Sequence, residues 1–314
     1  QTLLGDPNAE VREHAAHFLG ILGETSAYSA LRTLAKDKNA RVRRAAELAL
    51  NVLVYRPPYR LAIRTLGAFV IRRGDTEVRD RDWRSSKARQ LFQLLLTERG
   101  RAVPRERVLD LLWPELDVDA AANNLRVTIN RLSKALEPDR PDGAPSAYIQ
   151  QQGDTYTLGS EADLDIDVVQ FADAVTEGQL AIQRGQRATA VAAFRRAVEM
   201  YGGPYLPDSM YEDWSTIERE RLELMFNEAA LTLGTLLLEE GQPSAAIGMA
   251  WRVLEYDRTY EDAYSLLMRA HAALGERSTA IRLYQRCVSM LKEELGIEPL
   301  QETTMLYEQI RSMT

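Results

Sequence analysis

The stretch AANNLRVTINRLSKALEP, residues 121–138, reads as one amphipathic α-helix. At 100° per residue, four apolar side chains fall within about 60° of one another and predict a buried face: Leu125, Ile129, Leu132 and Leu136. The other side collects amide and basic side chains without an acid: Asn123, Asn124, Arg126, Val127, Asn130, Arg131 and Lys134. Such side chains bond base edges and phosphates in the major groove of DNA. The pattern favours a DNA-reading helix, with a plain solvated helix as the alternative.

The elements on either side of this helix predict a small mixed domain. RLAIRTLGAFVIRRG (60–74) alternates apolar and basic residues and, with TEVRDRDW (76–83), predicts an antiparallel sheet. Two helices follow: SSKARQLFQLLLTERG (85–100) opens with a serine cap and closes on Gly100, and VPRERVLDLLWPE (103–115) has Pro104 in its first turn. AYIQQQGDTYTLG (147–159) predicts a hairpin. Strands, three helices and a hairpin indicate a winged helix-turn-helix.

Residues ahead of the recognition helix are candidates for contacts with the DNA backbone. The helix that begins near Ser85 directs its first N–H groups and its dipole outward, which suits a phosphate. The candidates are Arg84, Ser86, Lys87, Arg89, Arg105 and Trp113. The alternative interpretation makes the polar members caps and solubilising charges, and makes Trp113 a core residue. In the hairpin, Gln152, Gly153 and Thr155 are the candidates for a wing.

The first 55 residues contain a twofold repeat. DPNAEVREHAAHFLG (6–20) aligns with DKNARVRRAAELALN (37–51) at a shift of 31 residues. An Asp-initiated helix with apolar residues at i, i+4 and i+8 is a stacking unit of the HEAT-like kind, although an ordinary helical hairpin is the alternative. Two such units are too few for a stable solenoid, so we expect them to end a longer array. The segment YRPPY (55–59) follows as a linker, because two prolines cannot continue a helix.

The last half of the chain repeats with a longer period. GQPSAAIGMAWRVLEYD (241–257) aligns with GERSTAIRLYQRCVSML (275–291) at a shift of 34, and GQRATAVAAFRRAVEMY (185–201) matches both. A 34-residue helical repeat with a small residue where helices touch is typical of tetratricopeptide repeats. We therefore predict a mainly α chain of three domains: HEAT-like repeats (1–55), a small α+β winged helix (60–160) and a tetratricopeptide-like domain (163–314).

Charge is distributed unevenly among these parts. The whole chain has a formal charge of −7. Residues 56–160 carry 18 basic and 14 acidic side chains, whereas residues 161–314 carry 14 basic and 26 acidic ones. The basic middle and the acidic last part are therefore expected to meet different partners.

Two further stretches resemble known families. NNLRVTINRLSKALEP, followed by YIQQQGDTYTLG, resembles the OmpR-type winged-helix DNA-binding domain. EDWSTIERERLELMFNEAALTLGTLLLEEG (212–241), the repeats after it and ELGIEPLQETTMLYEQI (294–310) resemble the bacterial transcriptional activator domain. Together, over about residues 57–314, they resemble the SARP-type (antibiotic-regulatory-protein) transcriptional activators. Larger members of that family also carry an ATPase and repeats, and there those parts usually follow the activator domain, whereas here the repeat lies in front of it. The resemblance implies a basic wing residue in the minor groove, but here the wing tip is Gln152, Gly153 and Asp154.

The sequence offers little support for an enzyme. No G-x-x-x-x-G-K-[ST] phosphate loop occurs. His14 and His17 lie three positions apart without partner ligands, so we predict no metal and no cofactor. Cys287, the single cysteine, matches Val253 in the preceding repeat and is expected to be a buried thiol. The ERER segment (218–221) is explained by a Glu–Arg pair at i, i+3. No apolar run of membrane-spanning length occurs, and we expect a cytoplasmic, nucleoid-associated protein.

These observations favour a sequence-specific DNA-binding transcriptional activator. The recognition helix would read the promoter major groove, and the acidic helical domain would mediate assembly, effector response or contact with RNA polymerase. The resemblance also implies direct repeats in double-stranded DNA and a homodimer bound to them. The alternative is a protein-interaction scaffold whose winged helix does not read DNA. The acid-free face of the recognition helix argues against a scaffold, which has no need of it.

Overall fold

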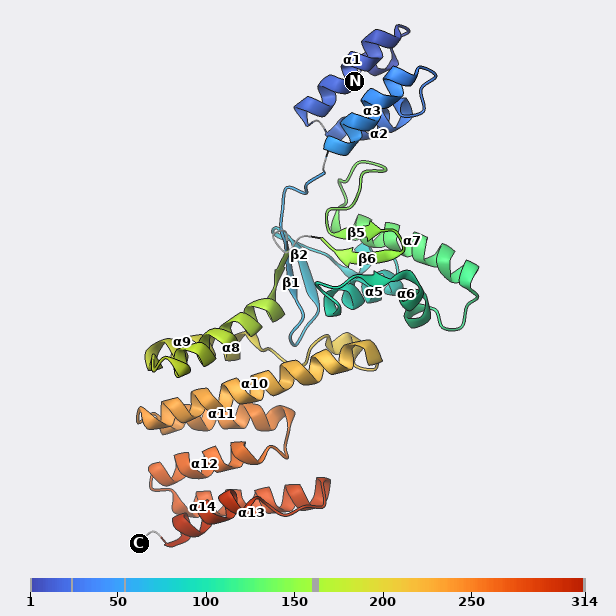
Figure 1. Cartoon of the computed structure of the whole chain (residues 1–314). Helices are drawn as coiled ribbons and strands as arrows, with labels where there is room; N and C mark the ends of the chain where they lie inside the picture. Colours follow the sequence, from blue (N-terminus) through green and yellow to red (C-terminus); the bar gives the residue numbers. More distant parts are fainter. Residues whose placement is uncertain (1, 24, 54, 160–163, 313–314) are drawn as a thin grey trace. The chain divides into compact units, whose positions relative to one another are not determined.

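The computed structural model describes residues 2–23, 25–53, 55–159 and 164–312 (Figure 1). The chain is mainly α-helical with small sheets, as the sequence predicted. It folds into two compact units. The first unit comprises residues 1–63 and 70–165, and the second comprises 64–69 and 166–314. None of the helices described is both long and apolar enough to cross a membrane.

The first unit begins with the HEAT-like pair. Its helices are α1 (Ala9–Leu22), α2 (Tyr28–Leu34) and α3 (Ala40–Val52), with short 3-10 turns at Thr2–Gly5 and Thr25–Ala27. The repeat was predicted correctly, but the capping residue was not. Asn8 and Asn39 cap α1 and α3, each accepting a backbone N–H at 2.9 Å. Asp6 and Asp37 lie two positions earlier and accept the N–H of those asparagines, because both side chains suit N-terminal turns.

The segment predicted to be a linker has no regular structure, but its tyrosines are packed. Tyr55 is buried with the HEAT-like core. The Tyr59 hydroxyl donates to the carbonyl of Leu136 at 2.9 Å, and Tyr148 donates its hydroxyl to the carbonyl of Tyr59 at 2.7 Å. The aromatic residues therefore tie this segment to its surroundings, while the prolines keep it out of a helix.

Two sheets frame the winged helix. The first has the order β3-β2-β1-β7, from β1 (Leu61–Arg64), β2 (Val70–Arg73), β3 (Thr76–Glu77) and β7 (Leu164–Ile166). The second has the order β4-β6-β5, from β4 (Val103–Pro104), β5 (Ile149–Gln152) and β6 (Thr155–Leu158). The predicted hairpin is β5–β6. Strands β4 and β7, which are short and pair with distant residues, were not anticipated.

The helices of the winged domain are α4 (Asp80–Trp83), α5 (Ser86–Thr97), α6 (Arg105–Leu112) and α7 (Val118–Leu136). Their ends differ in detail from the prediction. Ser85 occupies the N-cap position of α5 without a side-chain cap bond, and the helix ends before Gly100. Pro104 belongs to β4 and caps α6 rather than lying in its first turn. The core holds Trp83 and Phe92, whose rings lie 6.1 Å apart.

The second unit is a stack of helices, which Figure 1 shows layered from α8 to α14. They are α8 (Asp167–Gln183), α9 (Arg187–Met200), α10 (Asp213–Glu239), α11 (Pro243–Tyr256), α12 (Glu261–Ala273), α13 (Arg277–Glu294) and α14 (Gln301–Ser312). The small residue expected at each helix contact, Ala190, Ala246 and Ala280, is fully buried. Tyr201 stacks on Phe226 with ring centroids 4.2 Å apart. The tetratricopeptide-like packing is therefore as predicted.

Candidate nucleic-acid interface

The candidate recognition helix is α7. Its N-cap Asp117 accepts the N–H of Ala120 at 2.9 Å, so the helix begins at Val118, three residues before the stretch first considered. Leu125, Leu132 and Leu136 are buried, as the periodicity predicted. Ile129, the fourth residue of the predicted inner face, is only half-buried, because it faces a cavity rather than the packed core.

The outer face of α7 is open to solvent. All seven residues predicted to contact DNA are exposed: Asn123, Asn124, Arg126, Val127, Asn130, Arg131 and Lys134. Even the apolar Val127 is 41% exposed. Among the described residues, the structure gives Arg126, Arg131 and Lys134 no carboxylate partner. The face therefore presents three uncommitted cations and three amides along one rigid element, which suits hydrogen bonding to base edges and phosphates.

The hairpin next to α7 has a two-residue turn. Gln152 pairs with Thr155, and Gly153 takes a positive φ of 59° at the first central position of the turn. The turn is further fixed by Thr155, whose hydroxyl donates to the carbonyl of Gln152 at 2.9 Å. Gln152, Gly153 and Asp154 are exposed, so the tip itself presents no cation.

A cationic residue nevertheless lies beside the wing. The backbone N–H of Arg105 donates to the carbonyl of Asp154 at 2.7 Å, which places the start of α6 against the hairpin. Burial raises the pKa of the Tyr156 hydroxyl, and the nearby charges of Arg105 and Arg126 oppose that rise. Arg105 and Arg126 therefore flank the same strand from two different helices. The sequence did not predict this, because it depends on the pairing of Val103 with Tyr156.

The remaining residues predicted to contact the DNA backbone lie in different surroundings. Arg84 and Ser86 are exposed and Lys87 is half-buried, at a helix N-terminus that Ser85 leaves uncapped. This arrangement leaves N–H groups available to an anion. Arg89 is less available, because its guanidinium lies 3.6 Å from the carboxylate of Asp80.

Trp113, the last of these candidates, is half-buried at the C-terminal end of α6. Its backbone N–H donates to the carbonyl of Leu109 at 2.8 Å. The ring is therefore neither fully in the core nor fully exposed.

A cavity of about 1140 Å³ adjoins the recognition helix within the first unit. Its wall includes Asn130 of α7 and Gln150 and Gln152 of the wing strand. The lining also includes four arginines and no carboxylate residue: Arg32, Arg56, Arg126 and Arg140. Arg140 is partly neutralised by Glu137 at 3.6 Å. Sequence reasoning missed Arg32 and Arg56, because only the fold brings them near α7.

Other reactive side chains do not assemble into a site. Within the described residues, no group of three or more His, Cys, Asp or Glu side chains could hold a metal ion. The ring of His14 bonds the carbonyl of Glu10 at 2.7 Å. Cys287 is buried in α13, as expected, and burial raises its pKa to about 12. Glu218 and Arg221 form the predicted i, i+3 pair, with contacts of 2.7 and 2.9 Å.

Three family descriptions match the chain. Residues 166–311 match "Bacterial transcriptional activator domain", and residues 83–153 match "Transcriptional regulatory protein, C terminal". Residues 1–51 match "HEAT repeats". The first two cover the tetratricopeptide-like helices and most of the winged helix, including α7.

Curated relatives share this central and C-terminal part. The transcriptional regulatory protein MoaR1 of Mycobacterium tuberculosis is 24% identical over 228 residues, covering 71% of this chain and 71% of that protein. The regulatory protein DnrI of Streptomyces peucetius is 24% identical, covering 68% of this chain and 79% of that protein. The regulatory protein AfsR of Streptomyces griseus is 26% identical over 72% of this chain, which spans only 22% of the longer AfsR.

A solved structure has a similar fold. It is titled Mycobacterium tuberculosis EmbR in complex with low affinity phosphopeptide. The likeness has a TM-score of 0.69 at 22% identity and covers 80% of this chain and 65% of that one. At this level of identity the likeness supports the arrangement of elements and nothing about ligands.

Proposed function

We propose that this chain, which belongs to the SARP-type bacterial transcriptional regulators, binds promoter DNA through α7 and activates transcription. The observation that carries the proposal is the exposed, acid-free face of α7, opposite the buried Leu125, Leu132 and Leu136. A helix held rigidly by one face and offering amides and free cations on the other can enter the major groove.

The side chains divide between reading bases and holding phosphates. Asn123 and Asn130 can each form two hydrogen bonds with an adenine, Arg131 can do so with a guanine, and Val127 can contact a thymine methyl group. Beside these four side chains lie Asn124, Arg126 and Lys134, which would contact the phosphates of the two DNA strands. Basic residues that neutralise phosphates supply affinity without sequence preference.

Backbone contacts would come from elements on either side of α7. The uncapped start of α5, with Arg84, Ser86 and Lys87, suits a phosphate. Arg105 lies beside the wing, whose candidate residues are Gln152, Gly153 and Thr155, and would supply the cation that the wing lacks. Arg89 and Trp113 would contribute less, because one is paired with Asp80 and the other is half-buried.

The acidic helical unit would take part in assembly and in contact with RNA polymerase. Residues 161–314 carry 26 acidic side chains against 14 basic ones, so this part is repelled by DNA and is free for protein partners. Two chains bound to directly repeated half-sites would contact each other through this acidic helical unit. A protein acting in this way works on the nucleoid, in the cytoplasm.

The test is selection from a random duplex library, followed by a salt titration of the selected duplex with the full chain. Sequence-specific binding should enrich one motif, and the logarithm of the affinity should fall linearly with the logarithm of salt concentration. The matched pair of variants is Arg131→Ala, on the proposed reading face, and Arg107→Ala, an exposed arginine paired with Glu98. Arg131→Ala should relax base preference, while Arg107→Ala should not.

Two outcomes would refute the proposal. The first is that no motif is enriched and the residual binding does not depend on salt. The second is that the motif is unchanged by substitutions across the face of α7. Tight binding of a protein partner without any duplex binding would favour an interaction scaffold instead.

A further inference from the structure

The HEAT-like pair packs on the loop that joins the recognition helix α7 to the wing strand β5. Ala144 of this loop is buried in the HEAT-like core together with Leu53 and Tyr55. Gly143, beside it, has a positive φ of 84°, and a Cβ at this position would collide with the guanidinium of Arg32 from α2. The HEAT-like pair is therefore a direct neighbour of the segment between the two elements expected to contact DNA.

The same loop is fixed to the end of α7. Glu137, directly after the helix, has a fully buried side chain whose carboxylate accepts the N–H of Ala147 at 2.8 Å and the hydroxyl of Ser146. The guanidinium of Arg140 lies 3.6 Å from this carboxylate and donates to the carbonyl of Ala144. Because these contacts hold the loop in one conformation, the HEAT-like pair packs on a fixed segment rather than on a free linker.

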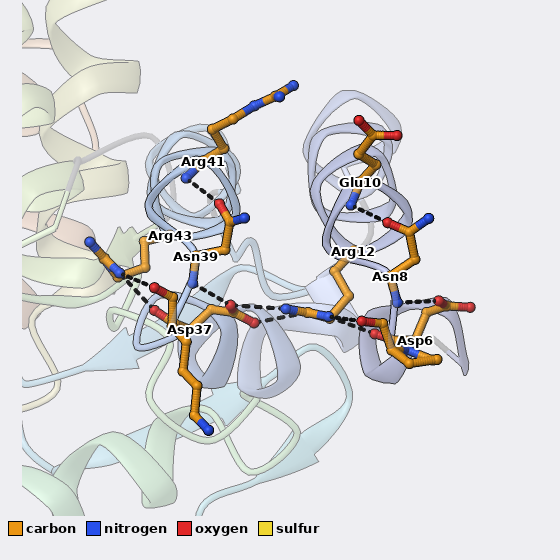
Figure 2. Close-up of polar contacts among 10 residues, drawn as sticks. Asp6, Asn8, Glu10, Arg12, Asp37, Asn39, Arg41 and Arg43 are labelled. Carbon is orange, nitrogen blue, oxygen red and sulfur yellow. Dashed lines mark hydrogen bonds and ion pairs between the residues drawn. The ribbon is translucent and has the colours of Figure 1, made fainter.

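The arginines in and next to the HEAT-like pair fall into two groups. Arg12 donates to the two carboxylate oxygens of Asp37, at 2.9 and 3.0 Å, and Arg43 donates to the carbonyl of Asp37 at 2.8 Å (Figure 2). These two arginines hold the repeats together. Arg32 and Arg56, by contrast, are exposed, and no carboxylate of the described residues forms an ion pair with either. Their charges are therefore available to a ligand.

These two available arginines line the cavity of about 1140 Å³ that adjoins α7. The wall combines them with hydrogen-bond donors of α7 and β5, all of them exposed: Arg32, Arg56, Arg126, Asn130, Gln150 and Gln152. Tyr55, which is 8% exposed and also lines the cavity, has a buried hydroxyl without a hydrogen-bond partner among the described residues. The cavity therefore offers positive charge and donors to an anion, and it shares residues with the face of α7 proposed to bind DNA.

The character of the cavity favours a nucleic-acid strand over a small phosphorylated ligand. Pockets for small ligands are usually about 300–1,000 Å³, are lined mainly by apolar side chains and bury most of the ligand. This cavity is larger, and its arginines and amides are mostly exposed. Arginines and amides that donate from several elements to phosphate oxygens are typical of the contacts that position a protein on a duplex.

We propose that Arg32 and Arg56 bind the phosphate backbone of the DNA that α7 reads, so that the HEAT-like pair forms part of the DNA interface. The proposal rests on the function proposed above, because α7 must first bind a duplex. A strand that passes Arg126 and Asn130 would continue through the cavity to the two arginines. These contacts would lie beside the base pairs that α7 reads, and would add affinity without changing base preference.

The test compares double variants of the full chain on a duplex that carries the selected motif with about ten base pairs, one helical turn, on each side. Arg32→Ala with Arg56→Ala removes both proposed contacts. Arg44→Ala with Arg60→Ala is the matched control, because these exposed arginines lie on α3 and after the prolines but do not line the cavity. Each lost phosphate contact should reduce the salt slope by about 0.9, so the first variant should lose about two and the control should lose none.

Shortening the duplex separates these contacts from a general loss of positive charge. On a duplex trimmed to the motif read by α7, the Arg32→Ala, Arg56→Ala variant and the intact chain should have the same salt slope. On the long duplex, hydroxyl-radical footprinting should show that this variant loses protection at one flank and keeps it over the motif.

A gain-of-charge variant keeps the proposal testable if the double variant does not fold. Asn51→Arg adds a cation at an exposed position of α3 that lines the cavity, and should raise the salt slope on the long duplex by about one. Glu10→Gln makes the same change of net charge at an exposed position of α1 outside the cavity, and should leave the slope unchanged. Equal slopes for these two variants would overturn the proposal.

Failure of this proposal can be told apart from failure of the function on which it rests. If the intact chain enriches a motif but Arg32→Ala with Arg56→Ala leaves the salt slope unchanged, the HEAT-like pair does not bind DNA, and the role of α7 stands. If the intact chain enriches no motif, both proposals are wrong. Calorimetry with inorganic pyrophosphate tests the other source of phosphate. Pyrophosphate binding that the double variant abolishes, with the salt slope on DNA unchanged, would assign the cavity to a free anion and overturn the proposal.

Discussion

Thr65 and Asp167, 102 positions apart in the sequence, are joined by two hydrogen bonds. The Thr65 hydroxyl donates to Oδ1 of Asp167 at 2.6 Å, and its backbone N–H donates to Oδ2 at 2.7 Å. The N–H of Leu66 donates to the same Oδ2 at 2.9 Å. Next to them Gly67 is so close to Gly202 that a Cβ would lie 2.4 Å from its backbone. The turn between β1 and β2 is therefore fastened to the first residue of α8.

Removing the carboxylate of Asp167 is expected to loosen this turn. Asp167→Ala leaves three backbone N–H groups, those of Thr65, Leu66 and Val168, and a fully buried hydroxyl without their acceptor, which costs about 2–4 kcal/mol of unfolding free energy. Urea unfolding of the variant measures the loss. Asp173→Ala, an exposed acid on the same helix, is the matched control and should change little. Equal midpoints for the two variants would contradict a fastening role.

The cations on α7 are expected to differ in what they contribute. Arg131→Ala should weaken binding to the selected duplex by about 1–3 kcal/mol and relax preference at one base position. Lys134→Ala should weaken binding to all sequences alike and reduce the salt slope by about one. Fluorescence anisotropy across duplexes and salt concentrations separates the two effects. Indistinguishable profiles would show that neither residue reads bases.

Adding a cation to the wing tip is expected to tighten binding. Gln152→Arg places a positive charge on the exposed hairpin, where a minor-groove contact adds about one released counterion. Affinity and salt slope should both rise. Glu77→Gln, which raises the net charge by the same single unit at an exposed position in β3 of the other sheet, corrects for net charge. If both variants tighten binding equally, the wing does not approach DNA.

The inward and outward faces of α7 could be predicted because helical periodicity is local. Leu125, Leu132 and Leu136 are buried as expected, and the exception, Ile129, faces a cavity that includes residues far away in the sequence. The N-caps were misassigned because Asp6 and Asn8 both belong to residue types that begin helices. Composition alone does not decide which of two neighbouring caps binds which N–H.

What the sequence did not predict depends on long-range pairing. Strand β7 is three residues long and pairs with β1, about a hundred positions earlier. The approach of Arg105 to the wing follows from the pairing of Val103 with Tyr156. The bond from Thr65 to Asp167 has the same origin. Short strands and single polar contacts carry too little periodic signal to be recognised before the fold is known.

The buried thiol of Cys287 is expected to be unreactive in the folded chain. Burial raises its pKa from 9.0 to about 12, and only the thiolate is nucleophilic. Iodoacetamide at pH 8 should therefore modify the folded protein far more slowly than the protein in guanidinium. The raised pKa also means that the unfolded chain loses this proton first. Stability due to Cys287 should then fall as pH rises above 9.0. Equal rates of iodoacetamide modification in the folded and unfolded states would contradict the burial of Cys287.

Glu137, which follows α7 directly, is expected to make stability fall with rising pH. Burial raises the pKa of its carboxyl above the ordinary 4.5, although Ser146, the N–H of Ala147 and Arg140 oppose the rise. The folded state therefore binds the proton of Glu137 more tightly than the unfolded state does. The stabilisation that this proton provides is lost as pH rises above 4.5. Asp37 does not interfere, because the bond from Arg12 lowers its pKa and moves its effect below 3.8. The measurement is the unfolding free energy of the chain and of the Glu137→Gln variant from pH 4.5 to about 8. The first value minus the second should decrease as pH rises. A constant or increasing difference would show that the carboxylate is stabilised where it lies.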